Sequence, residues 1–215
     1  MKKNYFKKAV ALAGAAAFAI GLAGCAAEEE ATVSPTTGET AVVAEELTIA
    51  FVMGAESDPF FQAMKIGAEE EAAAQGVTLV WQGDPSNYSP ETQIPIVDAV
   101  LAQQPDGLVL IPTDPTSLQA SVAKAVAAGI AVANVDTRVG DLTDVLTFIT
   151  GDNVDGGAKA AEAIANAIGY TDGETYEVVI GLTSPTATTN VSRKEGFEAT
   201  IASTYPGIQI MDVAY

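Results

Sequence analysis

The chain has 215 residues, of which 48% are hydrophobic and 7% aromatic, and its formal net charge is −18 at pH 7. This hydrophobic content excludes a chain that is disordered throughout, and the strong acidity argues against nucleic-acid binding, which needs lysine and arginine to neutralise phosphates. The absence of histidine and the single cysteine exclude histidine-based catalysis, an intrachain disulfide and the usual zinc ligand sets.

The N-terminus has the pattern of an export signal. Basic MKKNYFKK precedes apolar AVALAGAAAFAIGL, which is too short and too rich in Ala and Gly to be a comfortable membrane span. The tetrad LAGC resembles a bacterial lipobox, which implies cleavage before Cys25 and attachment of fatty acids such as palmitate to its sulfur. Acyl chains anchor a protein to a membrane without a transmembrane helix. We therefore expect residues 1–24 to be a signal peptide and the protein to lie in the cell envelope, on the outer face of the cytoplasmic membrane or in the periplasm.

Residues 25–46 are rich in Glu, Thr, Ala and Pro and have no usable hydrophobic period. Like charges repel one another, and such a composition does not bury enough apolar surface to fold. We expect this segment to be an acidic, flexible tether.

From Leu47 onward, short β-rich runs alternate with helical stretches. The expected strands are 47–53, 77–82, 107–111 and 130–135, and the expected helices between them are 60–75, about 89–104, and 117–128. The spacing of the first three strands is typical of βαβ units, and continuous apolar strands indicate a sheet covered on both faces. Pro95 should kink or delay the second helix. Residues 47–150 are thus predicted to form an α/β lobe with a parallel sheet between helices.

The same alternation begins again after the strand expected at 145–149. Helical patterns at 152–168 and 191–204 flank an expected strand at 176–182, and a last strand pattern covers 207–215. We expect residues 151–215 to be the start of a second α/β lobe. A sheet of two strands is undersized and leaves an edge exposed, so we expect a C-terminally truncated chain whose second lobe is incomplete.

In open parallel sheets, ligands bind beyond the carboxyl ends of the strands. The loops expected there are rich in Asp, Asn, Thr and Ser: 54–61, 83–89, 112–116, 136–141, 150–153 and 183–190. One of them runs into a helix through two adjacent aromatic residues, Phe60 and Phe61, and only one of these can join the core behind it. The other can offer an apolar wall to the C–H face of a sugar ring, while Asp, Asn and Arg side chains bind the hydroxyl groups.

A family resemblance rests on several segments in this order and spacing. They are TIAFVMGAESDPFFQAMKIGAEEEAAAQGVTLV, PDGLVLIPTDPTSLQASVAKAVAAGIAVANVDTRV, FITGDNVDGGAKAAEAIA and SRKEGF. Together they resemble the type I periplasmic binding proteins of sugar ABC importers, above all the ribose-binding group, from Leu47 to Tyr215. The resemblance implies a two-lobed α/β protein without a cofactor or metal, which closes around a monosaccharide and delivers it to a membrane permease. We expect it to act as a monomer and not as an enzyme.

The resemblance also implies a set of ligand-binding residues: Asp58, Phe60, Phe61, Asp136, Thr137, Arg138 and Asn190. Asp58 stands where ribose binders often have Asn, and either side chain can bind a hydroxyl group. Arg138 is displaced by one position from the family pattern, because Thr137 intervenes.

In the second lobe, the sugar-binding Arg of ribose binders aligns with Val191 or with Asn190, so ribose itself is not implied. Arg193 aligns with a second Arg, for which a structural role is favoured. Asp152 and Asn153 are better suited to cap a helix than to contact a ligand.

Other functions fit the sequence less well. The glycines of GDNVDGG lack the G-x-G-x-x-G spacing of a dinucleotide-binding enzyme. A hydrolase using Asp58 and Asp136 would lack a histidine to support a nucleophile, and the sequence has no metal-ligand cluster. A sugar-responsive repressor is excluded by the export signal and by the lack of a DNA-binding segment. A receptor for autoinducer-2 or sugars and a nucleoside-binding lipoprotein of the same fold remain open alternatives.

Overall fold

A computed structural model describes residues 47–215, which fall within one compact unit, Ala44–Tyr215. The expected signal peptide, the tether and the lipid-attachment residue Cys25 lie outside the described residues. Among residues 47–215, no helix is both long enough and apolar enough to cross a membrane.

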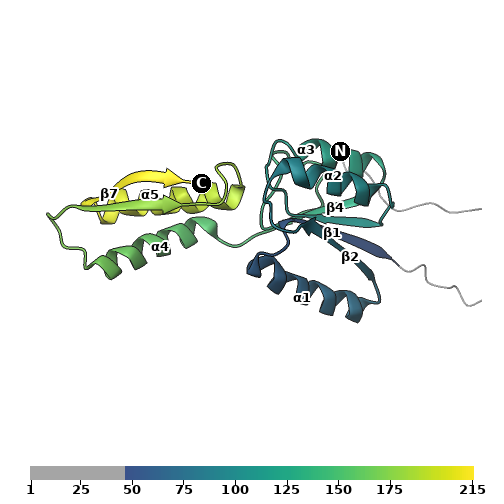
Figure 1. Ribbon diagram of the computed structural model, residues 1–215, viewed down its shortest axis with the longest axis horizontal. Helices are drawn as coiled ribbons and strands as arrows, with labels where there is room; N and C mark the ends of the chain where they lie inside the picture. Colours follow the sequence, from purple (N-terminus) through teal and green to yellow (C-terminus); the bar gives the residue numbers. More distant parts are fainter. Residues whose placement is uncertain (1–46) are drawn as a thin grey trace, which may run out of the picture. The chain divides into compact units, whose positions relative to one another are not determined.

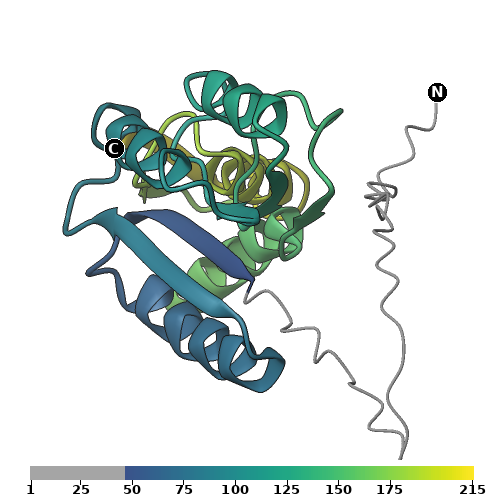
Figure 2. The ribbon, with the colours of Figure 1, turned by 90° about the vertical axis from the view of Figure 1, so that its right-hand side faces the viewer.

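Five parallel strands form the first sheet, in the spatial order β2-β1-β3-β4-β5. Their bounds are β1 Thr48–Ala55, β2 Thr78–Asp84, β3 Gly107–Leu110, β4 Ala131–Val135 and β5 Thr147–Ile149. Three helices cover this sheet: α1 Pro59–Gln75, α2 Pro90–Leu101 and α3 Gln119–Ala127. Helix α1 lies on one face, and α2 and α3 lie on the other (Figures 1 and 2). The parallel, doubly covered sheet predicted for residues 47–150 is confirmed.

Strand β1 shows why this sheet is buried on both faces. Successive residues of a strand point to opposite sides, so an apolar run supplies two cores at once. Ala50 and Val52 belong to the cluster beneath α2 and α3. Phe51 and Met53 belong to a second cluster beneath α1, together with Phe61, the only residue of α1 that is fully buried. The entry to α1 is therefore attached to the core through Phe61.

Helix α2 differs from its expectation in one respect. Ser89 caps the helix and Pro90 occupies its first turn, and the helix then runs through Pro95 to Leu101. Of the two effects expected of Pro95, a delayed start of the helix was wrong, and a kink stays a prediction. A proline inside a helix removes one backbone hydrogen bond, and here the packing of Val97, Val100 and Leu101 into the core keeps the helix intact around it.

The second part of the chain contains α4 Asn153–Ile168, β6 Tyr176–Gly181, α5 Thr188–Thr204 and β7 Ile208–Ala214. Strands β6 and β7 pair in parallel as a separate two-stranded sheet. Helices α4 and α5 pack closely together along this sheet (Figure 1), and a cluster around Ala161, Ala165, Ile201 and Ile208 forms their core. The short second sheet expected for residues 151–215 is thus present, and α5 begins at Thr188, three residues before the predicted start.

Candidate functional site

The carboxyl ends of the strands surround a pocket of about 1070 Å³, which we call the strand-end pocket. Its walls come from the loops after β1, β2 and β4, from the ends of β6 and β7, and from the first turns of α5. Pockets for small molecules usually measure about 300–1,000 Å³, so this one is large enough for a small ligand with bound water. Among the predicted site residues, it brings together Asp58, Phe60, Phe61, Asp136 and Asn190.

The two adjacent phenylalanines have different environments. Phe60 is 51% exposed, whereas Phe61 is 4% exposed and belongs to the core. Their rings meet edge to face, with centroids 5.4 Å apart. Asp58 sets this geometry, because its Oδ1 accepts a hydrogen bond of 2.8 Å from the Phe60 backbone N–H and caps α1. One ring therefore anchors the helix and the other presents a free apolar face at the pocket.

Tyr88 also lines the strand-end pocket, although it was not among the predicted site residues. Its ring is parallel to that of Phe61, at a centroid distance of 6.5 Å. Gly54 makes room for it, since a Cβ at Gly54 would lie 2.7 Å from Cε2 of Tyr88. Burial, with a contribution from the charge of Asp136, raises the pKa of Tyr88 to about 12, so its hydroxyl stays protonated at neutral pH and can donate a hydrogen bond.

Asp136 has an unusual backbone conformation at the end of β4. Its φ is +62°, and the N–H of Thr137 donates to the carbonyl of Val135 at 2.7 Å, which closes a γ-turn around Asp136. Such a turn is rare and strained for a residue other than glycine. Strain of this kind persists only where the surroundings impose it, and it is concentrated at functional sites.

A buried polar network imposes that conformation. The Thr137 hydroxyl donates to the carbonyl of Pro112 at 2.7 Å. Asn134 donates from its side chain to the carbonyl of Leu110 at 3.2 Å, and its Oδ1 accepts from the N–H of Val139 at 3.1 Å. These bonds close the loop after β4 against the end of β3, on either side of Asp136.

The same network explains why two predicted ligand residues do not reach the strand-end pocket. Thr137 is 1% exposed and lies under the turn, where it holds Asp136 in place. Arg138 lines a neighbouring cavity of about 540 Å³, and its guanidinium donates to the carbonyls of Val139 and Gly140, each at 3.2 Å. Asp136 alone of these three residues lines the strand-end pocket.

Helix α5 contributes two side chains from the opposite wall. Asn190 is mostly buried, and its amide donates to Oγ1 of Thr183 at 2.9 Å and to the carbonyl of Ser184 at 3.1 Å. Arg193 lies three residues further on, on the same face of the helix, and also lines the pocket. A structural role was favoured for Arg193, so its place in the lining was missed. The three-residue spacing from Asn190 was the signal that could have indicated it.

Arg193 and Asp136 influence each other electrostatically. Burial raises the pKa of the Asp136 carboxyl above its ordinary value, and the positive charge of Arg193 opposes part of that rise. The pocket therefore combines a half-buried acceptor with a cationic donor beside an exposed aromatic face. This set of groups is suited to a ligand with several hydroxyl groups and an apolar C–H face.

The helix-cap role expected for Asp152 is confirmed. Its side chain accepts a hydrogen bond of 2.9 Å from the N–H of Asp155 at the start of α4. Asn153 donates to Oγ1 of Thr150 at 3.1 Å. In residues 47–215, no three His, Cys, Asp or Glu side chains are grouped so that they could hold a metal ion.

Asp136→Asn should stabilise the protein at neutral pH by roughly 0.5–1 kcal/mol, as is common when an unfavourable functional residue is replaced. Asn adopts a positive φ at least as readily as Asp, so the gain comes from the loss of a partly buried charge and not from a change in the turn. Because the pKa of Asp136 is raised in the folded state, ionisation of this carboxyl lowers the stability of the fold. This loss of stability is absent below the unfolded pKa and grows as pH rises through the folded pKa. Urea denaturation at pH 7 and at about pH 4 should show the gain shrinking in acid.

Asp141→Asn is the matched control for this substitution. Hydrogen bonds from Thr143 lower the pKa of the exposed Asp141, so its ionised form favours the folded state. Removing that charge should lower stability at pH 7. An equal or lower stability of the Asp136→Asn variant at pH 7 would contradict the unfavourable effect assigned to the partly buried charge of Asp136.

Residues 49–215 match the periplasmic binding protein domain family. The ribose import binding protein of Bacillus subtilis is 32% identical over 125 residues, which cover 58% of this chain and 40% of that protein. The xylitol-binding protein of Mycolicibacterium smegmatis is 25% identical over 209 residues, covering 97% of this chain and 54% of that protein.

A solved structure of an ABC transporter solute-binding protein from Agrobacterium vitis, bound with α-D-tagatopyranose, is also similar. It matches with a TM-score of 0.73 and 36% sequence identity over 79% of this chain and 58% of that chain. This chain spans about half the length of the relatives that it matches. The matched domain, together with the doubly covered parallel sheet and its strand-end pocket, establishes that the chain belongs to the type I periplasmic binding protein family.

Proposed function

We propose that this protein is the substrate-binding component of an ABC importer, and that it captures a monosaccharide or a similar polyhydroxylated molecule without converting it. The observation that carries this proposal is the composition of the strand-end pocket. An exposed aromatic ring, Phe60, shares the pocket with the half-buried acceptor Asp136 and the donor Arg193.

Each group has a distinct task in such a complex. The Phe60 face packs against the C–H face of a sugar ring, and Asp136 accepts hydrogen bonds from ring hydroxyls. Arg193 donates to the ligand from the other wall, and charge-assisted hydrogen bonds of this kind are the stronger ones. Tyr88 and Asn190 supply further polar groups, while Asp58 holds the Phe60 backbone. Thr137 and Arg138 support the turn and the adjoining cavity.

The related proteins support a sugar or polyol as the class of ligand. Their names give ribose, D-allose and xylitol as ligands, and the solved neighbours include complexes with α-D-tagatopyranose and D-arabinose. All of these molecules are small polyols or sugars. The sugar bridges groups from both parts of the chain, and these additional contacts favour a closed state that a membrane permease recognises. We further propose an extracytoplasmic monomer, anchored through a lipid on Cys25.

A ligand panel tests the function directly. The full chain is incubated with D-ribose, D-allose, D-tagatose, D-arabinose and xylitol, followed by thermal denaturation, calorimetry and chromatography of the sugars. At least one of them should raise the melting temperature, because a ligand at 100 times its Kd stabilises the folded state by about 2.7 kcal/mol. The sugars should be recovered unchanged. Chemical conversion of a sugar, or no binding across the panel, would overturn the proposal.

Two substitutions localise any binding to the strand-end pocket. Phe60→Ala should weaken binding while the melting temperature of the free protein stays nearly constant, because this ring is 51% exposed. Phe61→Ala should instead destabilise the fold by about 3–5 kcal/mol, the usual range for a buried phenylalanine. Undiminished binding in the Phe60→Ala variant would place the ligand elsewhere.

A further inference from the structure

Helices α4 and α5 touch through their backbones at two glycines. A Cβ added to Gly157 of α4 would lie 2.8 Å from the carbonyl carbon of Arg193 and 2.8 Å from the backbone nitrogen of Phe197, and closer still to the Arg193 carbonyl oxygen. A Cβ added to Gly196 of α5 would lie 2.8 Å from the carbonyl carbon of Val154. Real Cβ atoms essentially never come within 3.0 Å of such atoms. Only glycine at both positions permits this approach.

The first of these contacts falls on the backbone of a residue that lines the strand-end pocket. Gly157 lies against the backbone of Arg193, whose side chain lines the pocket together with Asp136 and whose positive charge opposes the rise in the pKa of Asp136. A helix moves as a rigid element over one or two turns, so any substitution that pushes α5 away at Arg193 also shifts the guanidinium group. The helix crossing and the pocket are therefore mechanically connected.

We propose that Gly157 and Gly196 are positioning residues for ligand binding: their backbone contact holds α5 where Arg193 reaches into the strand-end pocket beside Asp136. The proposal deepens the proposed function and rests on it for the identity of the ligand. The geometric part, which concerns the place of Arg193, holds independently of what the pocket binds.

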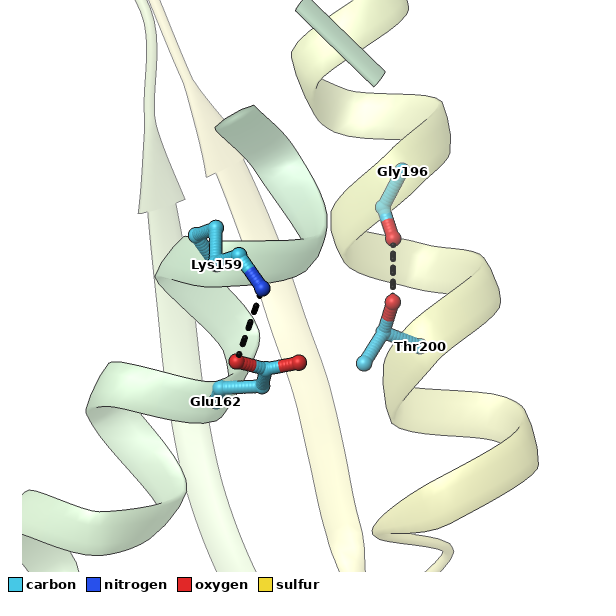
Figure 3. A network of polar contacts seen from close by, with 4 residues as sticks. All are labelled: Lys159, Glu162, Gly196 and Thr200. Atoms are coloured by element: carbon cyan, nitrogen blue, oxygen red, sulfur yellow. Dashed lines mark hydrogen bonds and ion pairs between the residues drawn. The ribbon is translucent and has the colours of Figure 1, made fainter. Parts of the chain in front are cut away.

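The surroundings of the crossing agree with a contact that is set by backbone approach. Small residues continue along α4 at four-residue spacing, Gly157, Ala161 and Ala165, and all three are buried. On α5, the carbonyl of Gly196 accepts a hydrogen bond of 2.9 Å from the hydroxyl of Thr200 (Figure 3), so this carbonyl has a side-chain partner within its own helix. No side chain is interposed between the helices at Gly157 and Gly196.

The adjacent glycine of the same helix provides a matched control. Gly156 has no atom within 4 Å of the place where a Cβ would stand, and it is exposed. The ion pair of Lys159 and Glu162 also lies on α4 (Figure 3), and both of these side chains are largely exposed. Gly156→Ala should therefore be tolerated without moving α5, and it should gain the usual helix-propensity benefit of alanine over glycine.

The experiment compares Gly157→Ala, Gly156→Ala and Arg193→Ala in the full chain, with two measurements on each. Carbon-13 NMR titration follows the pKa of the Asp136 carboxyl in the free protein. Calorimetry measures binding of D-ribose, D-allose, D-tagatose and xylitol. Gly157→Ala should raise the pKa of Asp136, because Arg193 moves away, and should weaken sugar binding at least about tenfold, in line with the sensitivity of sites to displacements of about 1 Å. Gly156→Ala should change neither quantity.

A double variant separates positioning from a general loss of stability. If Gly157 acts through Arg193, then Gly157→Ala added to Arg193→Ala should cause little further change in the Asp136 pKa or in sugar affinity. Additive effects would overturn the proposal. So would an unchanged Asp136 pKa in the Gly157→Ala variant or in the Arg193→Ala variant, or a change of equal size in Gly156→Ala.

The proposal can still be tested if Gly157→Ala does not fold or if no sugar binds. If Gly157→Ala does not fold, Ala161→Val adds bulk one turn further along the buried face of α4, away from the contact with Arg193, and should shift the Asp136 pKa in the same direction by less. An unchanged pKa in a folded Ala161→Val variant would then count against the proposal. If the NMR results are as expected but no sugar binds, the positioning stands and the proposed function fails.

Discussion

Arg193→Met should reduce sugar affinity by about one to two orders of magnitude, the largest expected effect on binding. Arg193 is exposed at the pocket wall, so the variant loses a charge-assisted hydrogen bond to the ligand, which usually contributes about 1.5–3 kcal/mol, and about 1.4 kcal/mol corresponds to a factor of ten. The variant loses the donor on the α5 wall of the pocket and also leaves Asp136 without its opposing charge. Calorimetry with the sugar that binds best in the panel measures the change.

Arg138→Met is the matched control, because it makes the same change of side chain in the loop after β4. Arg138 lines the neighbouring cavity and bonds to two backbone carbonyls of its own loop. Its replacement should change affinity by less than about threefold, since the effects of residues that do not touch the ligand are usually small. Equal losses in the two variants would show that the ligand does not distinguish the two arginines, and the assignment of Arg193 would fail.

The residual binding of the Arg193→Met variant should also depend differently on pH. Without Arg193, only burial acts strongly on Asp136, so the pKa of Asp136 rises further above its ordinary value. The carboxylate is then lost at a higher pH as the solution is acidified. Affinity should begin to fall at a higher pH in the variant than in the parent protein, and identical pH profiles would contradict the influence of the Arg193 charge on the pKa of Asp136.

The sequence was sufficient to predict the elements of the fold, because their signals are local. Apolar runs followed by helical patterns located every strand of the first sheet to within a few residues, and the helix expected at 60–75 occupies Pro59–Gln75. Phe60 and Phe61 were correctly expected to diverge, because adjacent residues of a helix point in directions about 100° apart. These predictions needed only the periods of helices and strands.

The details of the site were less predictable, because they depend on backbone geometry that residue types do not specify. Strand alternation does not continue past Val135: the γ-turn at Asp136 directs Thr137 into the interior and Arg138 toward the neighbouring cavity. Asp is common in turns of many kinds, so its presence did not reveal a positive φ. Arg193 was underestimated for a related reason, since its place in the pocket depends on how closely α5 approaches α4.

An effect on stability comparable to that of Phe61→Ala should come from replacing Gln93, which connects the end of β3 to α2. Its amide donates to the carbonyl of Ile111 at 2.7 Å, and its Oε1 accepts from the N–H of Thr113 at 2.8 Å. Gln93→Leu keeps similar volume but leaves two buried backbone groups unpaired, at about 1–3 kcal/mol each. The free energy of unfolding, measured with urea, should fall by about 2–6 kcal/mol.

Gln103→Leu is the control, because Gln103 follows the same helix and is exposed, with a single bond of 3.3 Å to the carbonyl of Ala99. Substitutions at exposed positions usually change the free energy of unfolding by no more than about 0.5 kcal/mol. A loss of stability in Gln93→Leu no greater than that of the control would mean that the buried amide does not hold the end of β3.

Gln93→Glu tests the hydrogen bonds of residue 93 directly, because only a protonated Glu can both accept from Thr113 and donate to the carbonyl of Ile111. Burial of the carboxyl raises its folded-state pKa above the unfolded value of about 4.3. The stability contributed by this group is then fully present below the unfolded pKa and is lost as pH rises through the folded pKa. Relative to the parent protein, Gln93→Glu should be close to normal in acid and strongly destabilised at neutral pH. A deficit independent of pH would mean that volume or shape, and not its hydrogen bonds, accounts for the role of Gln93 at the end of β3.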